Sequence, residues 1–422
     1  MYSFMFKYVI IIKNLIQRNQ QMKNLRNLFL ITTTLFLSFN TVQAQSKYLI
    51  LAEGDSWKPL MASNLTENYV QINRLPFSGF VMVGNTFTNK VMKVDVNVSY
   101  ASVWAELQSL QGLYPNKRNF LQINIDFPAD FWNDEAWERV SSNFKTVAQV
   151  AKDLNFTGIA FDDEPYSKSA MRMVNFKFPN KNELSFHSKT WEIKGSQDSW
   201  VDENAYANKY HSFAEHMEKV TERFKNIMQK MEEGYPSLTL LIYNGASYAH
   251  ENTNKEHTIL TDVGLAREHE YKGAIFAGFV KGEGDYMEIH DMGESYKYRK
   301  DEHFRYAYEW RKKNISKDRF NDDLDPTYQW RIPENLRSQW SRSVSVGFMV
   351  YNKGQESNEV EFDTRGHSTK EDIAESLKLA LAYSDKYVIY YEQGEAWLLP
   401  NQEEPIASDW YSMMQEIYNS IQ

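Results

Sequence analysis

One short stretch sets the fold of this chain: Phe156-Thr157-Gly158-Ile159-Ala160-Phe161-Asp162-Asp163-Glu164-Pro165-Tyr166. An apolar run typical of a buried strand passes directly into three adjacent carboxylates. Because strand side chains alternate between two faces, Asp162 and Glu164 are expected to point inward, and Asp163 to face solvent. Paired carboxylates at a strand end are typical of a barrel mouth, where like charges raise one pKa and keep a proton available. The alternative is a helix N-terminus, where acids offset the helix dipole.

The pattern around this stretch extends over most of the chain. Short β-rich runs alternate with helical periodicity, which predicts a parallel sheet joined by crossover helices. Eight strands are expected, at residues 48–52, 79–83, 120–126, 157–162, 238–243, 287–291, 343–351 and 387–391. Eight is the number that a (β/α)8 barrel needs, so the predicted fold is an α/β TIM barrel with long βα-loop insertions.

Three helices have a clear period. Apolar residues recur at three- and four-residue steps from Trp137 to Leu154, behind Asp134 as the expected cap. A second helix is predicted from Ala205 to Glu233, ending at Gly234 and Pro236, and a third from Thr369 to Asp385. Without internal repeats or a Pro-rich linker, residues 45–422 are predicted to form a single catalytic barrel domain.

The first 44 residues are predicted to be a signal peptide. Lys23 and Arg26 precede an apolar run, residues 28–39, which ends at Val42-Gln43-Ala44. A second apolar and basic stretch precedes Met22, which is therefore the expected true start. An uncleaved anchor is the alternative. After cleavage the protein is expected to be secreted or periplasmic, without stable membrane insertion, and the absence of cysteine means that export requires no disulfide.

The net charge of the chain argues against one class of partner. Residues 1–44 contain five basic and no acidic residues, so their removal shifts the formal net charge from -9 to -14. A nucleic-acid partner is therefore not expected. The segment Tyr166–Gln197 runs against this trend, with six Lys or Arg, two acids and Trp191. It predicts a lid that attracts an anionic glycan, the alternative being a solvated loop that balances nearby acids.

Polar residues also follow other predicted strands. The third strand carries Asn124, and the sixth ends in His290, Asp291 and, three residues later, Glu294. The eighth ends in Tyr390 and Glu392, with Trp397 soon after. Because active sites of barrels lie at the carboxyl ends of the strands, these residues are candidates for one site.

These residues resemble those of secreted bacterial TIM-barrel glycoside hydrolases. Asp163-Glu164-Pro165 is similar to the Asn-Glu-Pro of the large retaining clan, which implies an acid/base role for Glu164, although residues 346–352 lack that clan's nucleophilic Glu. Asp162 and Glu164 also resemble the end of the chitinase signature, but Thr157 and Ala160 replace its earlier aspartates. In the α-galactosidase-like clan, Asp162 would be the nucleophile, with Asp291 or Glu294 as acid. The resemblance implies the superfamily and no particular family.

The sequence thus predicts a glycosidase that cleaves a polysaccharide, with an anionic (sulfated or uronic) one favoured by the basic loop. Glu164 is the expected general acid, and Glu294, Asp162 and Glu392 compete to be the nucleophile or base. The expected substrate-binding residues are Asp163, Tyr166, Asn124, His290, Asp291, Tyr390, Trp397 and Trp191. No cofactor and no metal are predicted, since no zinc pattern or glycine-rich phosphate loop occurs. The acids at 162–164 would otherwise suit calcium or magnesium. The oligomeric state is not encoded in any pattern.

Two other functions remain open. Residues 49–56 resemble the first block of Gly-Asp-Ser esterases, with Ser56 as nucleophile, but the later Gly-x-Asn-Asp block is missing. A non-catalytic glycan-binding barrel is the other alternative, because a fold can outlast its chemistry.

Overall fold

A computed structural model gives the architecture of the chain. It divides into two units, residues 1–46 and 47–422, and the fold below is that of the second. The structure describes residues 46–53, 60–93, 95–126, 131–164, 176–177, 211, 213–246, 265–266, 268–293, 295, 298–317, 332–351, 370–392 and 408–422.

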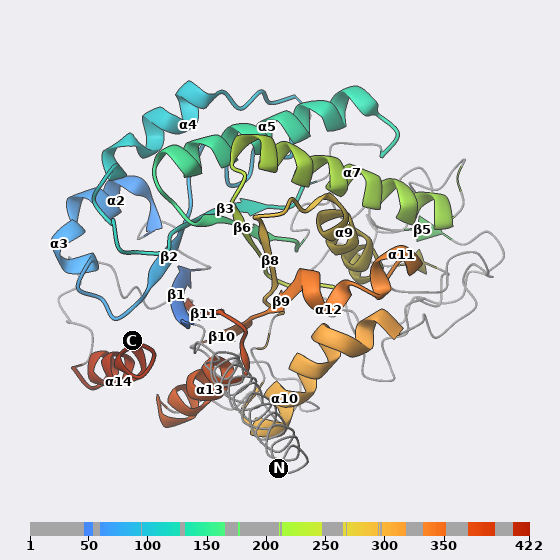
Figure 1. Cartoon of the computed structure of the whole chain (residues 1–422). Helices are drawn as coiled ribbons and strands as arrows, with labels where there is room; N and C mark the ends of the chain where they lie inside the picture. Colours follow the sequence, from blue (N-terminus) through green and yellow to red (C-terminus); the bar gives the residue numbers. More distant parts are fainter. Residues whose placement is uncertain are drawn as a thin grey trace, which may run out of the picture. The chain divides into compact units, whose positions relative to one another are not determined.

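A parallel sheet forms the centre of residues 47–422 (Figure 1). Its strands pair in the order β10-β11-β1-β2-β3-β4-β6-β8-β9. Their bounds are β1 Tyr48–Glu53, β2 Gly79–Met82, β3 Phe120–Asn124, β4 Gly158–Asp162, β6 Thr239–Ile242, β8 Glu288–Asp291, β9 Val344–Val346, β10 Phe348–Tyr351 and β11 Tyr387–Glu392. Each predicted strand is present, and the seventh is divided into β9 and β10.

The sheet returns on itself at Gly347, the residue between β9 and β10. β9 pairs with β8, whereas β10 pairs with β11, so one continuous segment joins both ends of the strand order. The Gly347 backbone N–H donates to Asp291 O at 2.8 Å, and its carbonyl accepts from the buried Arg311 at 2.9 Å. The result is the expected (β/α)8 barrel.

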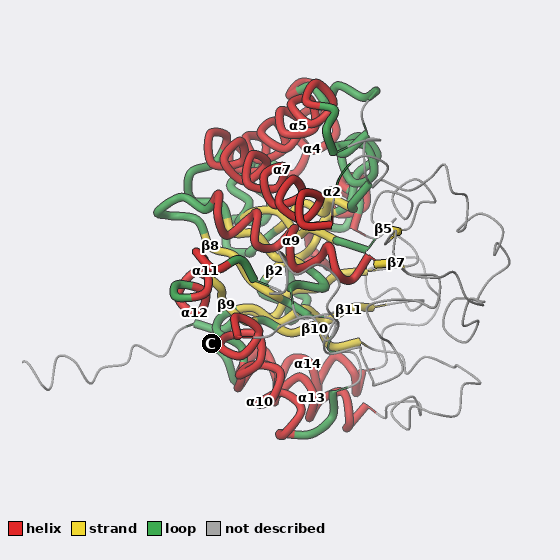
Figure 2. Tube along the Cα trace, turned by 90° about the vertical axis from the view of Figure 1, so that its right-hand side faces the viewer, coloured by secondary structure: helices red, strands yellow, loops and turns green. Residues whose placement is uncertain are grey.

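Helices surround the strands (Figure 2). The α-helices are α2 Ala62–Glu67, α3 Tyr69–Ile72, α4 Tyr100–Leu107, α5 Asp134–Asp153, α7 Phe213–Gly234, α9 Glu268–Gly282, α10 Asp301–Glu309, α11 Glu334–Arg337, α12 Trp340–Ser343, α13 Lys370–Tyr383 and α14 Ser408–Asn419. Shorter helical turns are η2 Gln108–Leu110, η5 Trp310–Asn314 and η6 Ile315–Lys317. A separate antiparallel pair, β5 Phe176–Lys177 and β7 Leu265–Ala266, was not expected from the sequence.

Phe161 anchors β4 to the helical layer. Its ring lies 6.1 Å from the ring of Phe144 in α5, 6.1 Å from that of Phe224 in α7 and 5.4 Å from that of Phe279 in α9. Its neighbour Ala160 belongs instead to the apolar cluster inside the barrel. Strand alternation therefore directs Asp162 to the inner side, as expected. At the start of the strand, Gly158 lets β4 approach β6 closely, because a Cβ there would lie 1.8 Å from Thr239 O.

The predicted helices are also present. For the second helix the structure gives α7 over residues 213–234, and its expected start at Ala205 lies outside the described residues. The N-cap of α5 is Asn133, whose side chain accepts from the Ala136 N–H, rather than the expected Asp134. The amphipathic helix α7 packs against both α5 and α9. α13 begins and ends within two residues of the predicted range. Among the described residues, no helix is both long and apolar enough to cross a bilayer.

Candidate active site

The carboxyl end of β4 holds two carboxylates at different depths. Asp162 is the last residue of the strand and only 4% exposed, whereas Glu164 lies two residues further and is half-buried. Asp162 Oδ1 accepts a hydrogen bond from the backbone N–H of Glu164 at 3.1 Å. This bond spans two residues and turns the chain at the strand end, as Asp side chains commonly do. The inner carboxylate therefore fixes the peptide that carries the outer one.

A hydrogen-bonded amide chain lines β3 beside Asp162, its register partner being Asn124. Gln122 Nε2 donates to Asn124 Oδ1 at 2.8 Å, and Asn124 Nδ2 donates to Asn89 Oδ1 at 2.8 Å. Gln122 and Asn124 are buried, whereas Asn89 is exposed. The chain of amides thus runs from the barrel interior to solvent, and it can present donors and acceptors to a hydroxylated molecule.

Tyr243, just beyond β6, completes this inner wall. Its hydroxyl donates to Gln122 Oε1 at 3.3 Å. Burial, followed by the charges of Asp162 and Tyr391, holds the pKa of the Tyr243 phenol well above its usual range. Tyr243 is therefore a neutral hydrogen-bond donor near the Asp162 carboxylate at any physiological pH. On β10 and β11, which pair with each other, the rings of Tyr351 and Tyr391 lie 5.9 Å apart and add aromatic surface.

Asp163 occupies a different position from the one expected. It is only 2% exposed rather than facing solvent. Its Oδ1 accepts from both the backbone N–H and the Nδ2 of Asn244, each at 2.9 Å. Burial raises the pKa of the Asp163 carboxyl, and the nearby Lys272 ammonium of α9 opposes that rise. Asp163 thus links the ends of β4 and β6 through its bonds to Asn244.

The two candidates on β8 are both buried in contacts with other parts of the protein. The His290 ring packs edge-on against the ring of Tyr387, the first residue of β11, at 4.8 Å. Its Nε2 lies 3.5 Å from Glu288 Oε2, and burial lowers its pKa. Asp291 follows His290 in the strand, so its side chain points to the opposite face of the sheet. Its Oδ2 accepts from the Ala246 N–H at 3.2 Å, and its Oδ1 lies 3.9 Å from Arg311 Nε. Both side chains are 1% exposed, which suits structural roles better than the expected binding roles.

The candidates on β11 are directed outward. Tyr390 is fully buried in the outer core, and its ring lies 5.9 Å from that of Phe77. Glu392 has the same parity and is 1% exposed, with Glu53 of β1 as its register partner. The inward position between them belongs to Tyr391, which packs against the inner cluster. The structure therefore does not bring Glu392 or Tyr390 to the side of the sheet that holds Asp162.

Several expected site residues lie outside the described residues: Glu294, Tyr166, Trp191, Trp397 and the alternative nucleophile Ser56. Their expected roles remain predictions. In the part of the chain that the structure describes, no three acidic or histidine side chains are grouped closely enough to hold a metal ion.

Comparisons with known proteins assign no family to this chain. No family profile and no curated protein sequence matches it. Among solved structures, it is similar to a β-mannanase from the blue mussel Mytilus edulis, with 11% identity, 89% of this chain and 93% of the mannanase covered, and a TM-score of 0.41. It is similar to a chitinase domain from Pyrococcus furiosus with 9% identity, coverage of 89% and 96%, and a TM-score of 0.40. The 3-keto-D-glucoside 4-epimerase YcjR from E. coli gives 10% identity, coverage of 88% and 100%, and a TM-score of 0.39.

Sequence reasoning missed Asn89, Tyr243 and Tyr391 as parts of the inner wall. The signal for Tyr243 was present, because Leu241 and Tyr243 are two residues apart at the end of a predicted strand and share its inner face. Asn89 had no such signal, since it comes from the loop after β2 and meets Asn124 only in the folded chain.

Proposed function

We propose that this protein is a glycoside hydrolase that cleaves a polysaccharide, with Glu164 as the general acid. The observation that carries the proposal is the Asp162–Glu164 arrangement, in which a buried inward carboxylate is bonded to the peptide of a half-buried one at a barrel strand end. The neighbouring amides and phenol supply the hydrogen-bonding groups that sugar hydroxyls require.

In the proposed reaction, the Glu164 carboxyl gives its proton to the glycosidic oxygen while the bond from that oxygen to the anomeric carbon breaks. The oxygen of a water molecule forms the new bond to the anomeric carbon, and a carboxylate accepts the proton that this water loses. Asp162 would stabilise the positive charge that develops on the sugar ring, because its carboxylate is shielded from solvent. Glu294 is the other candidate for nucleophile or base. Glu392 is not proposed, because it lies on the outer face of β11.

The class of polysaccharide is a finer part of this proposal. The surplus of basic residues in Tyr166–Gln197 supports an anionic substrate on a chain of net charge -9. We further propose that residues 1–44 direct export and are then removed, so that the enzyme acts outside the cytoplasm.

The test is reducing-end release from sulfated, uronic and neutral polysaccharides by the wild type, Glu164→Gln and a control, Glu135→Gln. Glu135 is an exposed carboxylate in the first turn of α5, where its side chain is 85% exposed. Release by the wild type and the control should fall by roughly 10²–10⁴-fold in Glu164→Gln. Activity that survives in Glu164→Gln would remove Glu164 as the acid, and binding without release by any variant would favour a non-catalytic glycan-binding barrel.

A further inference from the structure

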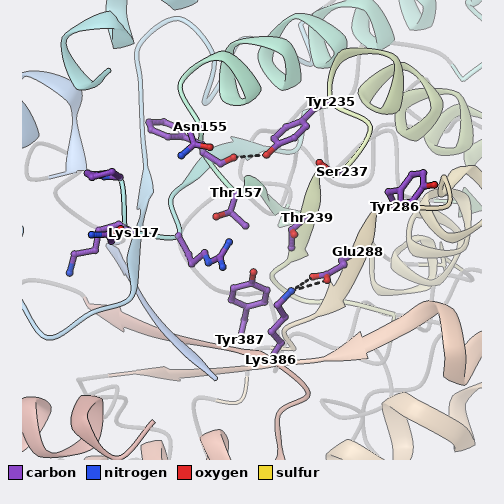
Figure 3. Close-up of a pocket in the computed structure, with 14 residues that line it drawn as sticks. Lys117, Asn155, Thr157, Tyr235, Ser237, Thr239, Tyr286, Glu288, Lys386 and Tyr387 are labelled. Atoms are coloured by element: carbon purple, nitrogen blue, oxygen red, sulfur yellow. Dashed lines mark hydrogen bonds and ion pairs between the residues drawn. The ribbon is translucent and has the colours of Figure 1, made fainter. Parts of the chain in front are cut away.

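A cavity of about 550 Å³ opens at the amino ends of the barrel strands (Figure 3). Its lining comes from residues just before, or at the start of, β3, β4, β6, β8 and β11, including Arg118, Thr157, Thr239, Glu288 and Tyr387. This volume lies within the range of roughly 300–1,000 Å³ that is common for small-molecule sites. We call this cavity the basal pocket.

The basal pocket is separate from the candidate active site. Thr157, the residue before β4, and Asp162, the last residue of β4, lie five positions apart, which corresponds to about 16 Å at the usual rise of a strand. Between the two ends, the barrel is filled by a buried apolar cluster that includes Phe120, Ala160 and Leu241. A molecule in the basal pocket would therefore be bound independently of the carboxylates at the other end.

The walls of the basal pocket are polar. Figure 3 shows Thr157, Thr239 and Tyr387 around its middle, with the Tyr387 hydroxyl directed into the cavity. On the far wall, the Tyr235 hydroxyl donates to Phe156 O at 2.9 Å. Hydroxyl groups of this kind both donate and accept, so they match the hydroxyls of a sugar-like molecule.

Two cations of the basal pocket, Lys117 and Arg118, have no carboxylate partner among the described residues. Lys386 is paired with Glu288, with bonds of 2.8 and 2.7 Å to the two carboxylate oxygens. Lys117 donates to the carbonyls of Leu75 and Phe77. Arg118 instead lies 5.0 Å over the ring of Tyr48 and donates to its hydroxyl at 3.3 Å, and no described carboxylate pairs with it.

The Arg118 guanidinium is close enough to two further phenols to act on them. Its charge opposes the effect of burial, which raises the pKa of both Tyr235 and Tyr387. Arg118 is exposed, yet it lies near the hydroxyl groups at the wall of the cavity. A guanidinium can bind a carboxylate or a sulfate through two parallel hydrogen bonds.

We propose that the basal pocket binds a hydroxylated, sugar-sized molecule with one oxyanion group, and that Arg118 holds that group. A carboxylate and a sulfate share this chemistry. The lining hydroxyls of Thr157, Thr239 and Tyr387 then contact the hydroxyls of the ligand. This binding is distinct from the proposed hydrolysis and does not depend on it.

The test is isothermal titration of the full chain with glucuronate, glucose 6-sulfate and glucose at millimolar concentrations. At least one of the two anions should bind at one site, more weakly at high salt, and neutral glucose should bind at least tenfold more weakly. Which of the two anions binds shows whether the pocket prefers a carboxylate or a sulfate. Arg118→Ala should weaken the binding of that anion at least tenfold. Arg118→Lys should restore part of the affinity, because Lys keeps the positive charge but cannot form two parallel hydrogen bonds.

Two matched variants locate the binding. Arg342→Ala removes an exposed arginine outside the basal pocket, and Glu164→Gln alters the opposite end of the barrel. Both should bind the anion like the wild type. Equal binding by Arg118→Ala, equal binding of glucose, loss of binding in Glu164→Gln, or no binding of either anion would overturn the proposal. Arg118 is exposed, so its variants should unfold at the wild-type denaturant concentration.

Discussion

Asp162 Oδ1 accepts the backbone N–H of Glu164 at 3.1 Å, so the deeper carboxylate of the pair orients the shallower one. Asp162 is expected to have two separable effects, one through this hydrogen bond and one through its charge. Asp162→Asn keeps an oxygen that can accept the bond, whereas Asp162→Ala removes both the acceptor and the charge. The two substitutions therefore distinguish positioning from electrostatics.

We predict that Asp162→Asn lowers kcat/KM for the proposed hydrolysis on the order of 10²-fold, because a solvent-shielded charge near the reacting sugar is lost. Its unfolding free energy should stay within about 1 kcal/mol of the wild type. Asp162→Ala should lose at least as much activity and more stability. Steady-state kinetics and urea unfolding measure the two effects separately, and an Asp162→Asn enzyme of full activity would contradict the electrostatic role.

Tyr243→Phe tests the inner wall. The substitution removes the donor to Gln122 Oε1 and the phenol near Asp162. We expect a loss of about 1–3 kcal/mol in unfolding free energy, since a buried acceptor is left without its donor. We also expect at least a tenfold loss in kcat/KM.

This loss should be the same from pH 6 to pH 9, because the Tyr243 pKa lies well above that range. Tyr100→Phe is the matched control, as the exposed Tyr100 hydroxyl donates to Asp153 at 2.9 Å far from the inner wall. An equal loss of activity in both variants would argue against a specific role for Tyr243.

Most of the strands were predictable because they are short and mainly apolar runs, as strands of parallel sheets are. Because apolar residues occur on both faces of a strand, the face to which some side chains point could not be predicted. In β11, Tyr390 and Tyr391 are adjacent and both aromatic, so the sequence alone could not indicate that Tyr391 faces inward and Glu392 outward. In β4, the small residues Gly158 and Ala160 marked the crowded inner face and placed Asp162 on it.

The burial of Asp163 was not predictable for a different reason. Its partners are Asn244 of the next strand end and Lys272 of α9, which are distant in the sequence. A carboxylate beside two others looks exposed when only its neighbours in the chain are considered.

Asp163→Ala should therefore destabilise the fold rather than alter substrate affinity. It leaves the backbone N–H and the Nδ2 of Asn244 without their acceptor, at about 1–3 kcal/mol for each donor. Asp153→Ala, which removes an exposed carboxylate at the end of α5, should cost less than about 1 kcal/mol. Urea unfolding of both variants gives the comparison; a higher KM for Asp163→Ala at unchanged stability would instead return Asp163 to substrate binding.

Glu53 gives a prediction for the pH dependence of stability. It is 4% exposed at the end of β1, and burial raises its pKa to about 8. In the unfolded chain, Glu53 ionises near pH 4.3. Between those values the folded state holds a proton that the unfolded state has lost, so the stability from this group is complete below pH 4.3 and is lost as pH rises toward 8.

We expect this group to contribute a fall of roughly 1.4 kcal/mol in unfolding free energy per pH unit between about pH 5 and pH 8. Glu53→Gln should remove that contribution, so the unfolding free energy of the variant should rise relative to that of the wild type as the pH increases toward 8. Glu302→Gln, at an exposed position in α10, should follow the wild type. Parallel slopes for the wild type and Glu53→Gln would mean that Glu53 is ionised in the folded protein.

The proposed export signal makes a prediction about the mature N-terminus. Cleavage after Val42-Gln43-Ala44 would leave Gln45 as the first residue, two residues before the barrel unit that begins at Lys47. When the full chain is expressed in a bacterium that exports proteins, intact-mass analysis of the periplasmic fraction should give the mass of residues 45–422. Ala44→Arg should block cleavage and keep the longer chain with the membrane fraction, because the cleavage site requires a small residue at that position. A cytoplasmic protein that retains residues 22–44 would contradict export, whereas an uncleaved wild-type chain in the membrane fraction would identify the segment as an anchor.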